Sequence, residues 1–142
     1  MVIVDANVLI YATNSAARQH PEAADWLDRA LAGAEAVGFA SVVLLAFMRL
    51  TTNPAIFPRP ISAEESAEQV EAWLGAPGAV VVEPTARHVH VLRGLIAESG
   101  AAGNLATDAH LAALAIEHGA DLVSYDRDFA RFAGVSHRLP GE

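Results

Sequence analysis

The stretch that decides the fold is residues 104–129, NLATDAHLAALAIEHGADLVSYDRDF. Over residues 105–118 the apolar side chains recur with the period of a helix, and Gly119 stands where a helix commonly ends. Leu122 and Val123 then predict a short apolar strand, and an acidic loop follows it. The stretch therefore predicts a helix, a tight turn, a strand and an acidic loop in succession.

Three acidic residues stand at the ends of these elements. Asp108 lies one turn into the helix, and Asp126 and Asp128 follow the strand directly. A helix made mostly of Ala and Leu needs no carboxylate to fold, and a buried strand does not need two at its exit. Acids in such places more often have a functional role. Asp108 could instead simply stabilise the positive end of the helix dipole, and Asp126 and Asp128 could form a turn.

The amino-terminal stretch, residues 1–12 with the sequence MVIVDANVLIYA, opens on a run of β-branched residues and closes that run with Asp5. A continuous run of this kind is typical of a strand buried on both faces, as in a parallel sheet. Ligands of open α/β sheets bind outside the carboxyl ends of the strands. If the first strand lies beside the strand that precedes Asp126, the two carboxylates meet there.

In that arrangement Asp5, Asp108, Asp126 and Asp128 converge at one edge of the sheet. Several carboxylates within a few ångströms repel one another strongly unless a cation lies among them. Ligands that are all oxygen favour Mg²⁺ or Mn²⁺ over zinc. The sequence therefore predicts a site for one of these two ions.

Other polar residues leave alternatives open. Asn7 and Ser124 could hydrogen-bond the metal-bound carboxylates or simply cap their own elements. Arg49 could bind phosphate or favour the carboxyl end of its helix. His110 and His118 share the acidic helix, but their spacing makes no ligand pair, and we expect a solvated or core-edge role for each.

Length and composition indicate one globular domain over residues 1–142. Hydrophobic residues make up 53% of the chain, which is enough to bury a sizeable core. The absence of cysteine excludes disulfides, zinc–thiolate sites and thiol catalysis. No apolar run reaches membrane-spanning length, and no basic segment precedes an apolar one, so a cytoplasmic location is expected.

The net charge of −8 argues against broad electrostatic binding of nucleic acid. A bound metal ion would reverse the sign that a phosphate meets locally, so a nucleic-acid enzyme is not excluded. All nine basic residues are arginine, whose guanidinium suits paired contacts to phosphate. The same bias is also typical of a GC-rich genome.

Strands and helices alternate along the rest of the chain. Further helices are expected at 7–11, 20–31, 42–51, 62–74, 84–98 and 127–132, and further strands at 37–40, 80–82 and 135–138. This alternation predicts an α/β fold with a mostly parallel central sheet flanked by helices on both faces.

Three segments in this order resemble one known family. VDANVLIYA at 4–12, LLAFMRLTTNPAIFPRPISAEES at 44–66 and TDAHLAALAIEHGADLVSYDRDF at 107–129 are similar to PIN-domain ribonucleases. They resemble in particular the VapC toxins of bacterial type II toxin–antitoxin pairs. The resemblance spans nearly the whole chain.

The resemblance implies a PIN-like α/β/α sandwich and cleavage of RNA that depends on Mg²⁺ or Mn²⁺. It also implies a VapB-like antitoxin as partner and, usually, a homodimer. By position, Asp5 matches the family's first metal acid, Asp108 the acid of its late helix, and Asp126 the acid after the next strand. These three are the expected catalytic and metal-binding residues, with Asp128 as an auxiliary acid.

One position departs from the family's pattern. Relatives commonly carry a Glu three residues before the Arg that matches Arg49, and this chain has Ala46 there. A catalytically degenerate PIN domain that acts by binding a DNA-binding antitoxin is therefore the alternative. A haloacid-dehalogenase-like phosphotransferase would need an acid two residues after Asp5, where Asn7 stands.

Overall fold

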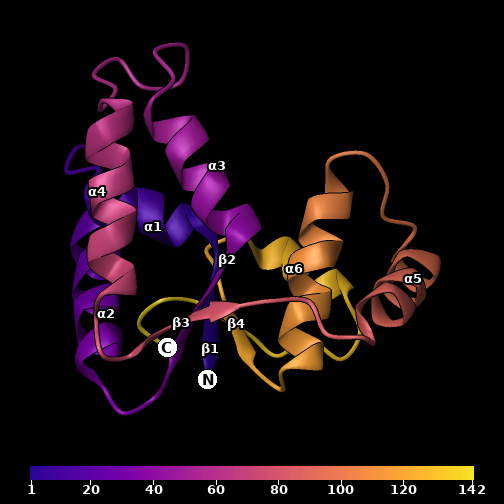
Figure 1. Cartoon of the computed structure of the whole chain (residues 1–142). Helices are drawn as coiled ribbons and strands as arrows, with labels where there is room; N and C mark the ends of the chain where they lie inside the picture. Colours follow the sequence, from indigo (N-terminus) through magenta and orange to yellow (C-terminus); the bar gives the residue numbers. More distant parts are fainter.

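The computed structural model describes residues 1–142 and is built on a five-stranded sheet with the order β3-β2-β1-β4-β5 (Figure 1). The strands are β1 (Val2–Val4), β2 (Val37–Ala40), β3 (Ala79–Val82), β4 (Asp121–Val123) and β5 (His137–Arg138). All four strand pairings are parallel, so the expected mostly parallel sheet is confirmed. Every residue of β1 and β2 is buried, as their apolar sequences require.

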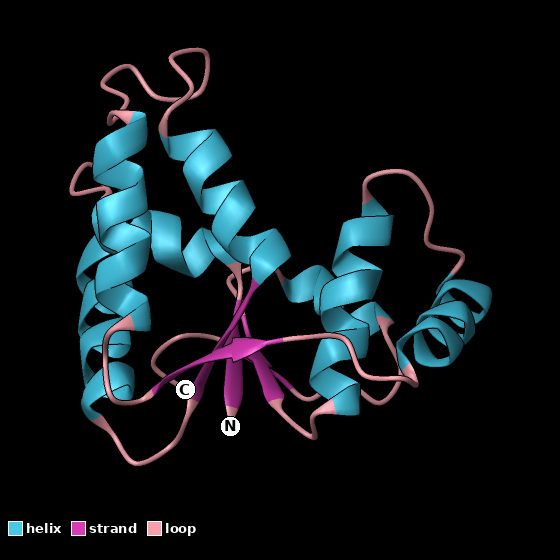
Figure 2. Ribbon diagram, viewed as in Figure 1, coloured by secondary structure: helices cyan, strands magenta, loops and turns pink.

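Helices cover the sheet on both sides (Figure 2). The elements are α1 (Ala6–Thr13), α2 (His20–Ala32), α3 (Ser41–Thr51), α4 (Ala63–Leu74), α5 (His88–Ser99), α6 (Leu105–Glu117) and the short 3₁₀ helix η1 (Arg127–Arg131). Helices α1 to α4 lie on one side and α5 and α6 on the other, which confirms the expected α/β/α sandwich (Figure 1). None of these helices is long and apolar enough to cross a membrane.

Helix α6 lies against the sheet through a nearly unbroken run of buried small and apolar residues. Ala109 and the five residues 111–115 are all buried. Gly119 adopts a left-handed conformation, with φ of 59°, just after the helix ends. Only glycine takes this conformation without steric cost, so the chain can turn there and enter β4. The predicted end of this helix is confirmed.

The strand order places a topological switch point between β1 and β4. The chain moves from β1 outward to β2 and β3, and then returns to add β4 on the other side of β1. Val4 pairs with Val123, and the next amide, that of Asp5, donates to the Val123 carbonyl at 3.0 Å. Asp5 therefore leaves β1 beside the end of β4, at the edge where open α/β sheets bind ligands.

Helix α5 begins later than the sequence predicts. The expected helix at 84–98 starts only at His88, because Thr85 is drawn toward α6 instead of entering a helical turn. Its amide and hydroxyl both donate to Oε1 of Glu117, at 2.9 and 2.6 Å. The prediction was wrong here because this contact joins residues 32 positions apart.

Helix α1 is also longer than predicted, and β5 is shorter. The helix starts at Ala6, and its cap is Asp5, whose Oδ1 accepts the Ala6 amide at 2.7 Å. Asn7 therefore lies inside the helix and does not cap it. The edge strand expected at 135–138 is formed by His137 and Arg138 alone.

Candidate active site

Asp5 is held in place by three donors at the carboxyl end of β1. Its Oδ1 accepts the Ala6 amide, and its Oδ2 accepts the Ser124 hydroxyl at 2.7 Å and the Asn7 side-chain amide at 3.2 Å. Burial raises the pKa of Asp5, and the hydrogen bonds from Ser124 and Ala6 offset part of that effect. The charge of Asp126 raises this pKa as well. Asp5 is thus an oriented carboxylate whose charge is not fully compensated.

Asn7 and Ser124 join the exits of β1 and β4 into one network. Ser124 is fully buried, and its hydroxyl accepts from the Asn7 side chain at 3.0 Å and from the Asp126 amide at 3.0 Å. The Asn7 side-chain oxygen accepts the Tyr125 amide at 3.1 Å. Of the two alternatives for these residues, the structure shows hydrogen bonding around the Asp5 carboxylate. They fix the position of Asp5 relative to the loop after β4.

Asp108 is half-buried in the first turn of α6, and its side chain makes no hydrogen bond within the protein. Burial raises the pKa of Asp108, and the charges of Asp5 and Asp126 raise it further. Arg131 lowers this pKa and Asp128 raises it, both to a smaller extent. The charges of Asp5, Asp126 and Asp128 therefore all act on Asp108.

Asp126 and Asp128 follow β4 but differ in their surroundings. Asp126 is half-buried, and its Oδ1 accepts the Asp128 amide at 2.8 Å, which starts η1. Asp128 is exposed and pairs with Arg131 at 3.4 Å. Asp126 thus forms the turn with one oxygen, while Asp128 is engaged at the surface.

The donor set fits a hard divalent cation, although it does not form a closed cage. No three acidic or histidine side chains are grouped so that they could hold an ion between them. All the donors at this edge are oxygen, and the raised pKa values of Asp5 and Asp108 reflect buried, mutually repelling charge that a cation would relieve. Mg²⁺ keeps several waters when it binds one or two carboxylates, so an incomplete cage suits it.

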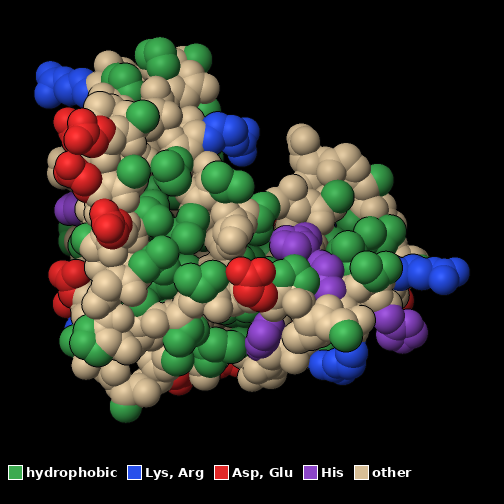
Figure 3. Space-filling view, viewed as in Figure 1, with side chains coloured by type: hydrophobic (Ala, Val, Ile, Leu, Met, Phe, Trp, Pro, Cys, Tyr) green, Lys and Arg blue, Asp and Glu red, His purple; other side chains and the backbone are tan.

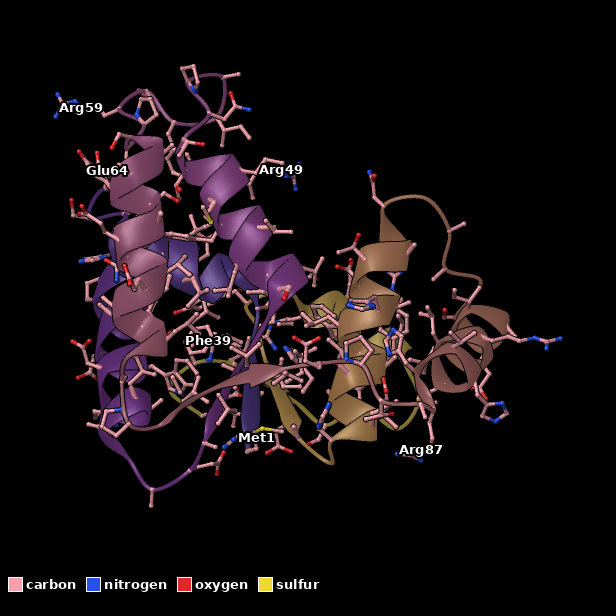
Figure 4. All side chains as sticks on the ribbon, in the orientation of Figure 1. Met1, Phe39, Arg49, Arg59, Glu64 and Arg87 are labelled. Atoms are coloured by element: carbon pink, nitrogen blue, oxygen red, sulfur yellow. The ribbon has the colours of Figure 1, made fainter.

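A hollow lies between the α3 side and the α6 side of the molecule (Figure 3). Arg49, in the last turn of α3, reaches from that helix over the hollow (Figure 4). Its side chain is exposed and forms no ion pair. Ala46 is half-buried one turn earlier on the same helix. A free guanidinium over this hollow is suited to hold a phosphate.

A second polar cluster lies between α5 and α6, and the sequence did not predict it. The side chain of Glu117 is fully buried and accepts from Thr85 and from Nδ1 of His88. The other ring nitrogen of His88, Nε2, meets Nδ1 of His110 at 2.8 Å. The only local signal was the spacing of His110 and Glu117, two turns apart on one helix face.

The protonation states in this cluster follow from burial and hydrogen bonding. Burial works to raise the pKa of Glu117, but hydrogen bonds from Thr85 and His88 outweigh it and hold the pKa below its usual value. Burial, and next the neighbouring His88, lower the pKa of His110. The expected solvated or core-edge role for His110 is replaced by a specific link between two helices.

Comparisons with known proteins find similar sequences and folds over nearly the whole chain. The family model described as "PIN domain" matches residues 2–135. Ribonuclease VapC37 of Mycobacterium tuberculosis is 55% identical over 140 residues, covering 99% of this chain and 97% of that protein. Among solved structures, VapBC2 from Rickettsia felis bound to a promoter DNA fragment has a TM-score of 0.72 at 17% identity, covering 98% of both chains. The sarcin–ricin-loop-cleaving toxin VapC20 of M. tuberculosis has a TM-score of 0.68 at 16% identity, covering 96% of this chain and 99% of that chain.

Proposed function

The chain belongs to the PIN-domain family and groups there with the VapC ribonucleases, and from this premise we propose that it is a metal-dependent endoribonuclease. Its substrate is RNA, whose phosphodiester bonds it hydrolyses with bound Mg²⁺ or Mn²⁺. The observation that carries the proposal is the pairing of β1 with β4, which puts Asp5 and Asp126 at adjoining strand exits, while the charges of both act on the half-buried Asp108.

Each residue of the site has a defined task in this proposal. Asp5 and Asp108 would hold the ion, with Asp126 as a further carboxylate. Ser124 and Asn7 keep the Asp5 carboxylate oriented. The bound ion supplies Lewis-acid chemistry that activates water and offsets the charge on the reacting phosphate.

Arg49 offers a positive charge that no acid of the protein pairs with. Its free guanidinium reaches over the hollow from α3 (Figure 4). Two parallel N–H groups of an arginine match two oxygens of one phosphate. We assign it to the RNA backbone, where it orients the strand for attack at the scissile bond.

The test is cleavage of labelled RNA by the purified protein. We expect activity with Mg²⁺ or Mn²⁺, none with EDTA, and a loss of at least about 100-fold in Asp5→Ala and Asp108→Ala, more than the removal of a supporting residue costs. Asp28→Ala, an exposed acid on α2, is the matched control and should cleave like the wild type. Circular dichroism checks that each variant is folded. Full activity of Asp5→Ala would reject the site assignment.

The degenerate-domain alternative makes the opposite prediction. It rests on Ala46, which removes one acid that relatives commonly carry. If the folded wild-type protein fails to cleave RNA at any Mg²⁺ or Mn²⁺ concentration, this alternative replaces the enzymatic one.

A toxin role with a protein partner follows from the relatives. Relatives of this chain are named VapC ribonucleases, and the structure of VapBC2 is bound to a DNA fragment from its promoter. We propose that a VapB-like, DNA-binding antitoxin covers this site and that the chain forms a homodimer. Expression should slow bacterial growth, and co-expression of the small protein encoded beside it should restore growth. Harmless expression of folded, metal-loaded protein would contradict the toxin role. Analytical ultracentrifugation of the purified protein measures whether it is a dimer.

A further inference from the structure

A cavity of about 460 Å³ lies at the same end of the sheet, on the side of α1 and α2. Its polar and aromatic lining comes from three segments of the chain: Tyr11, Arg18, Gln19, Glu22, Tyr125 and Arg127. We call it the tyrosine–arginine pocket. A volume of this size accommodates a small organic ligand, such as a single nucleotide.

The tyrosine–arginine pocket adjoins the acidic site through the loop after β4. Tyr125 and Arg127 are the residues on either side of Asp126. The Tyr125 amide donates to the side chain of Asn7, and Asn7 in turn donates to Asp5. The pocket and the acidic site therefore share the loop after β4, although none of the acids of the site lines the pocket.

The two tyrosines give the pocket a rigid aromatic wall. Their rings meet edge to face, with centroids 5.2 Å apart and planes at 78°. The Tyr125 hydroxyl donates to Oε1 of Glu22 at 2.9 Å, which holds this ring against α2. Aromatic faces that are fixed in advance are what proteins use to stack the bases of single-stranded RNA.

The two arginines give the same pocket its charge. Arg18 and Arg127 are both exposed, and neither forms an ion pair. The one acid in the lining, Glu22, is already engaged by a tyrosine hydroxyl. Gln19 adds an amide that both donates and accepts, as the edge of a base requires. The net charge of the chain is −8, so two free guanidinium groups beside an aromatic wall are a local exception. They favour an RNA strand over a basic or apolar protein segment.

We propose that the tyrosine–arginine pocket binds the nucleotide next to the scissile bond, with its base on the tyrosines and its phosphate on Arg18 and Arg127. This inference rests on the proposed ribonuclease function and names the part of the chain that reads the substrate. The acidic site then cuts, and the pocket sets which position of the strand is presented to it.

The aromatic half of the proposal is tested by RNA affinity without cleavage. In EDTA, a labelled single-stranded RNA is titrated with the purified protein and its variants. Tyr11→Leu should bind about tenfold more weakly, because it removes one stacking face. Tyr11→Phe keeps the ring and loses no hydrogen bond that the hydroxyl makes within the protein, so it should bind like the wild type.

The charged half is tested by salt dependence. Arg18→Gln and Arg127→Gln should each reduce the slope of log affinity against log salt by about 0.7, the value for one phosphate contact on a single strand. Arg93→Gln is the matched control: Arg93 is also an exposed arginine, but it lies on α5, on the other side of the sheet. A merely structural role for Arg18 would leave the slope unchanged.

Parallel cleavage assays with Mn²⁺ separate this inference from the proposed function. Wild-type cleavage together with unchanged affinity and unchanged salt slope in Tyr11→Leu and Arg18→Gln would overturn the pocket assignment alone, and would leave the pocket to a protein ligand. Absence of both RNA binding and cleavage in the folded wild type would overturn both. Weakened binding confined to the pocket variants, with thermal stability retained, supports the proposal.

Discussion

Asp108 is a residue of the acidic site whose ionised side chain lowers the stability of the folded protein. Its carboxylate is half-buried, has no hydrogen-bond partner and faces the charges of Asp5 and Asp126. Its pKa is raised, so the folded chain binds a proton at this carboxyl more tightly than the unfolded chain does. The ionised carboxylate therefore lowers stability at neutral pH, and this loss is relieved as the pH falls through the raised pKa.

Asp108→Asn should for this reason stabilise the metal-free protein at neutral pH, because it removes the unpaired charge and keeps the shape. The same change should weaken or abolish any stabilisation by Mn²⁺. Thermal melts with EDTA and with Mn²⁺ measure both effects. Asp28→Asn, on the exposed face of α2, controls for loss of net charge. A metal-free Asp108→Asn protein less stable than the wild type would contradict this account.

Ala46 stands where the resemblance to the family implies an acid. It lies one turn before Arg49 on α3, so the two are neighbours on one surface of that helix. We predict that Ala46→Glu binds Mn²⁺ about tenfold more tightly, a gain of about 1.4 kcal/mol, and lowers the stability of the metal-free protein. Calorimetric titration measures the affinity for Mn²⁺, and thermal melts measure the stability of the metal-free protein.

The control for that change is Leu45→Glu, which adds the same charge to a side chain that is 65% exposed. It should leave the affinity for Mn²⁺ close to that of the wild type. Equal affinities in all three proteins would show that Ala46 does not face the acidic site.

At the scale of elements, the link between α5 and α6 decides how the second helical layer is held. The Glu117 side chain in α6 accepts hydrogen bonds from Thr85, before α5, and from His88 at the start of α5. His88 in turn is hydrogen-bonded to His110 in α6. The buried carboxylate has its pKa lowered, so its ionised form stabilises the folded state. That contribution is present at neutral pH and is lost as the pH falls from 4.5 through the lowered pKa.

Glu117→Gln should lower the free energy of unfolding at pH 7 by about 1–3 kcal/mol, because the side chain loses its charge and the new amide nitrogen cannot accept the hydrogen bond from His88. The wild type should lose this advantage on acidification, so the two stability curves should converge below the usual pKa of a glutamate. Denaturant melts across pH 3–7 measure the difference. Glu98→Gln, an exposed position on α5, should change little. Parallel curves at all pH values would refute the assigned charge.

At the scale of the whole molecule, the strand order brings the ends of the chain together. The switch between β1 and β4 places residues from near the amino terminus and near the carboxyl terminus at one edge of the sheet. The chain concentrates repelling carboxylates there, and a cation that binds only the folded state would relieve them.

Mn²⁺ or Mg²⁺ should therefore raise the melting temperature, with about 2.7 kcal/mol of added stability at 100 times Kd. The gain should fade on acidification, because the raised pKa values of Asp5 and Asp108 let protons compete with the ion. Differential scanning calorimetry at several pH values tests this, with Na⁺ at equal ionic strength as control. A pH-independent metal shift would place the ion elsewhere.

The sequence by itself determined the elements whose cause is local. The apolar runs at 2–4 and 122–123 specify strands buried on both faces, and Gly119 specifies a left-handed helix end. Because each strand ends on or near an acid, the carboxyl-end rule predicts that Asp5 and Asp126 lie together if the two strands are neighbours. The pairing of β1 with β4 meets that condition, and the sequence alone did not contain it.

Only the tertiary structure decided the contacts that join residues far apart in the chain. The delayed start of α5, the buried Glu117 with its two histidines, the position of Asn7 between two strand exits and the tyrosine–arginine pocket all depend on such contacts. Periodicity describes one element at a time and carries no information on which side chains of another element it meets. Where a polar side chain finds its partner 29 or 117 residues away, the packing of the layers alone selects that partner.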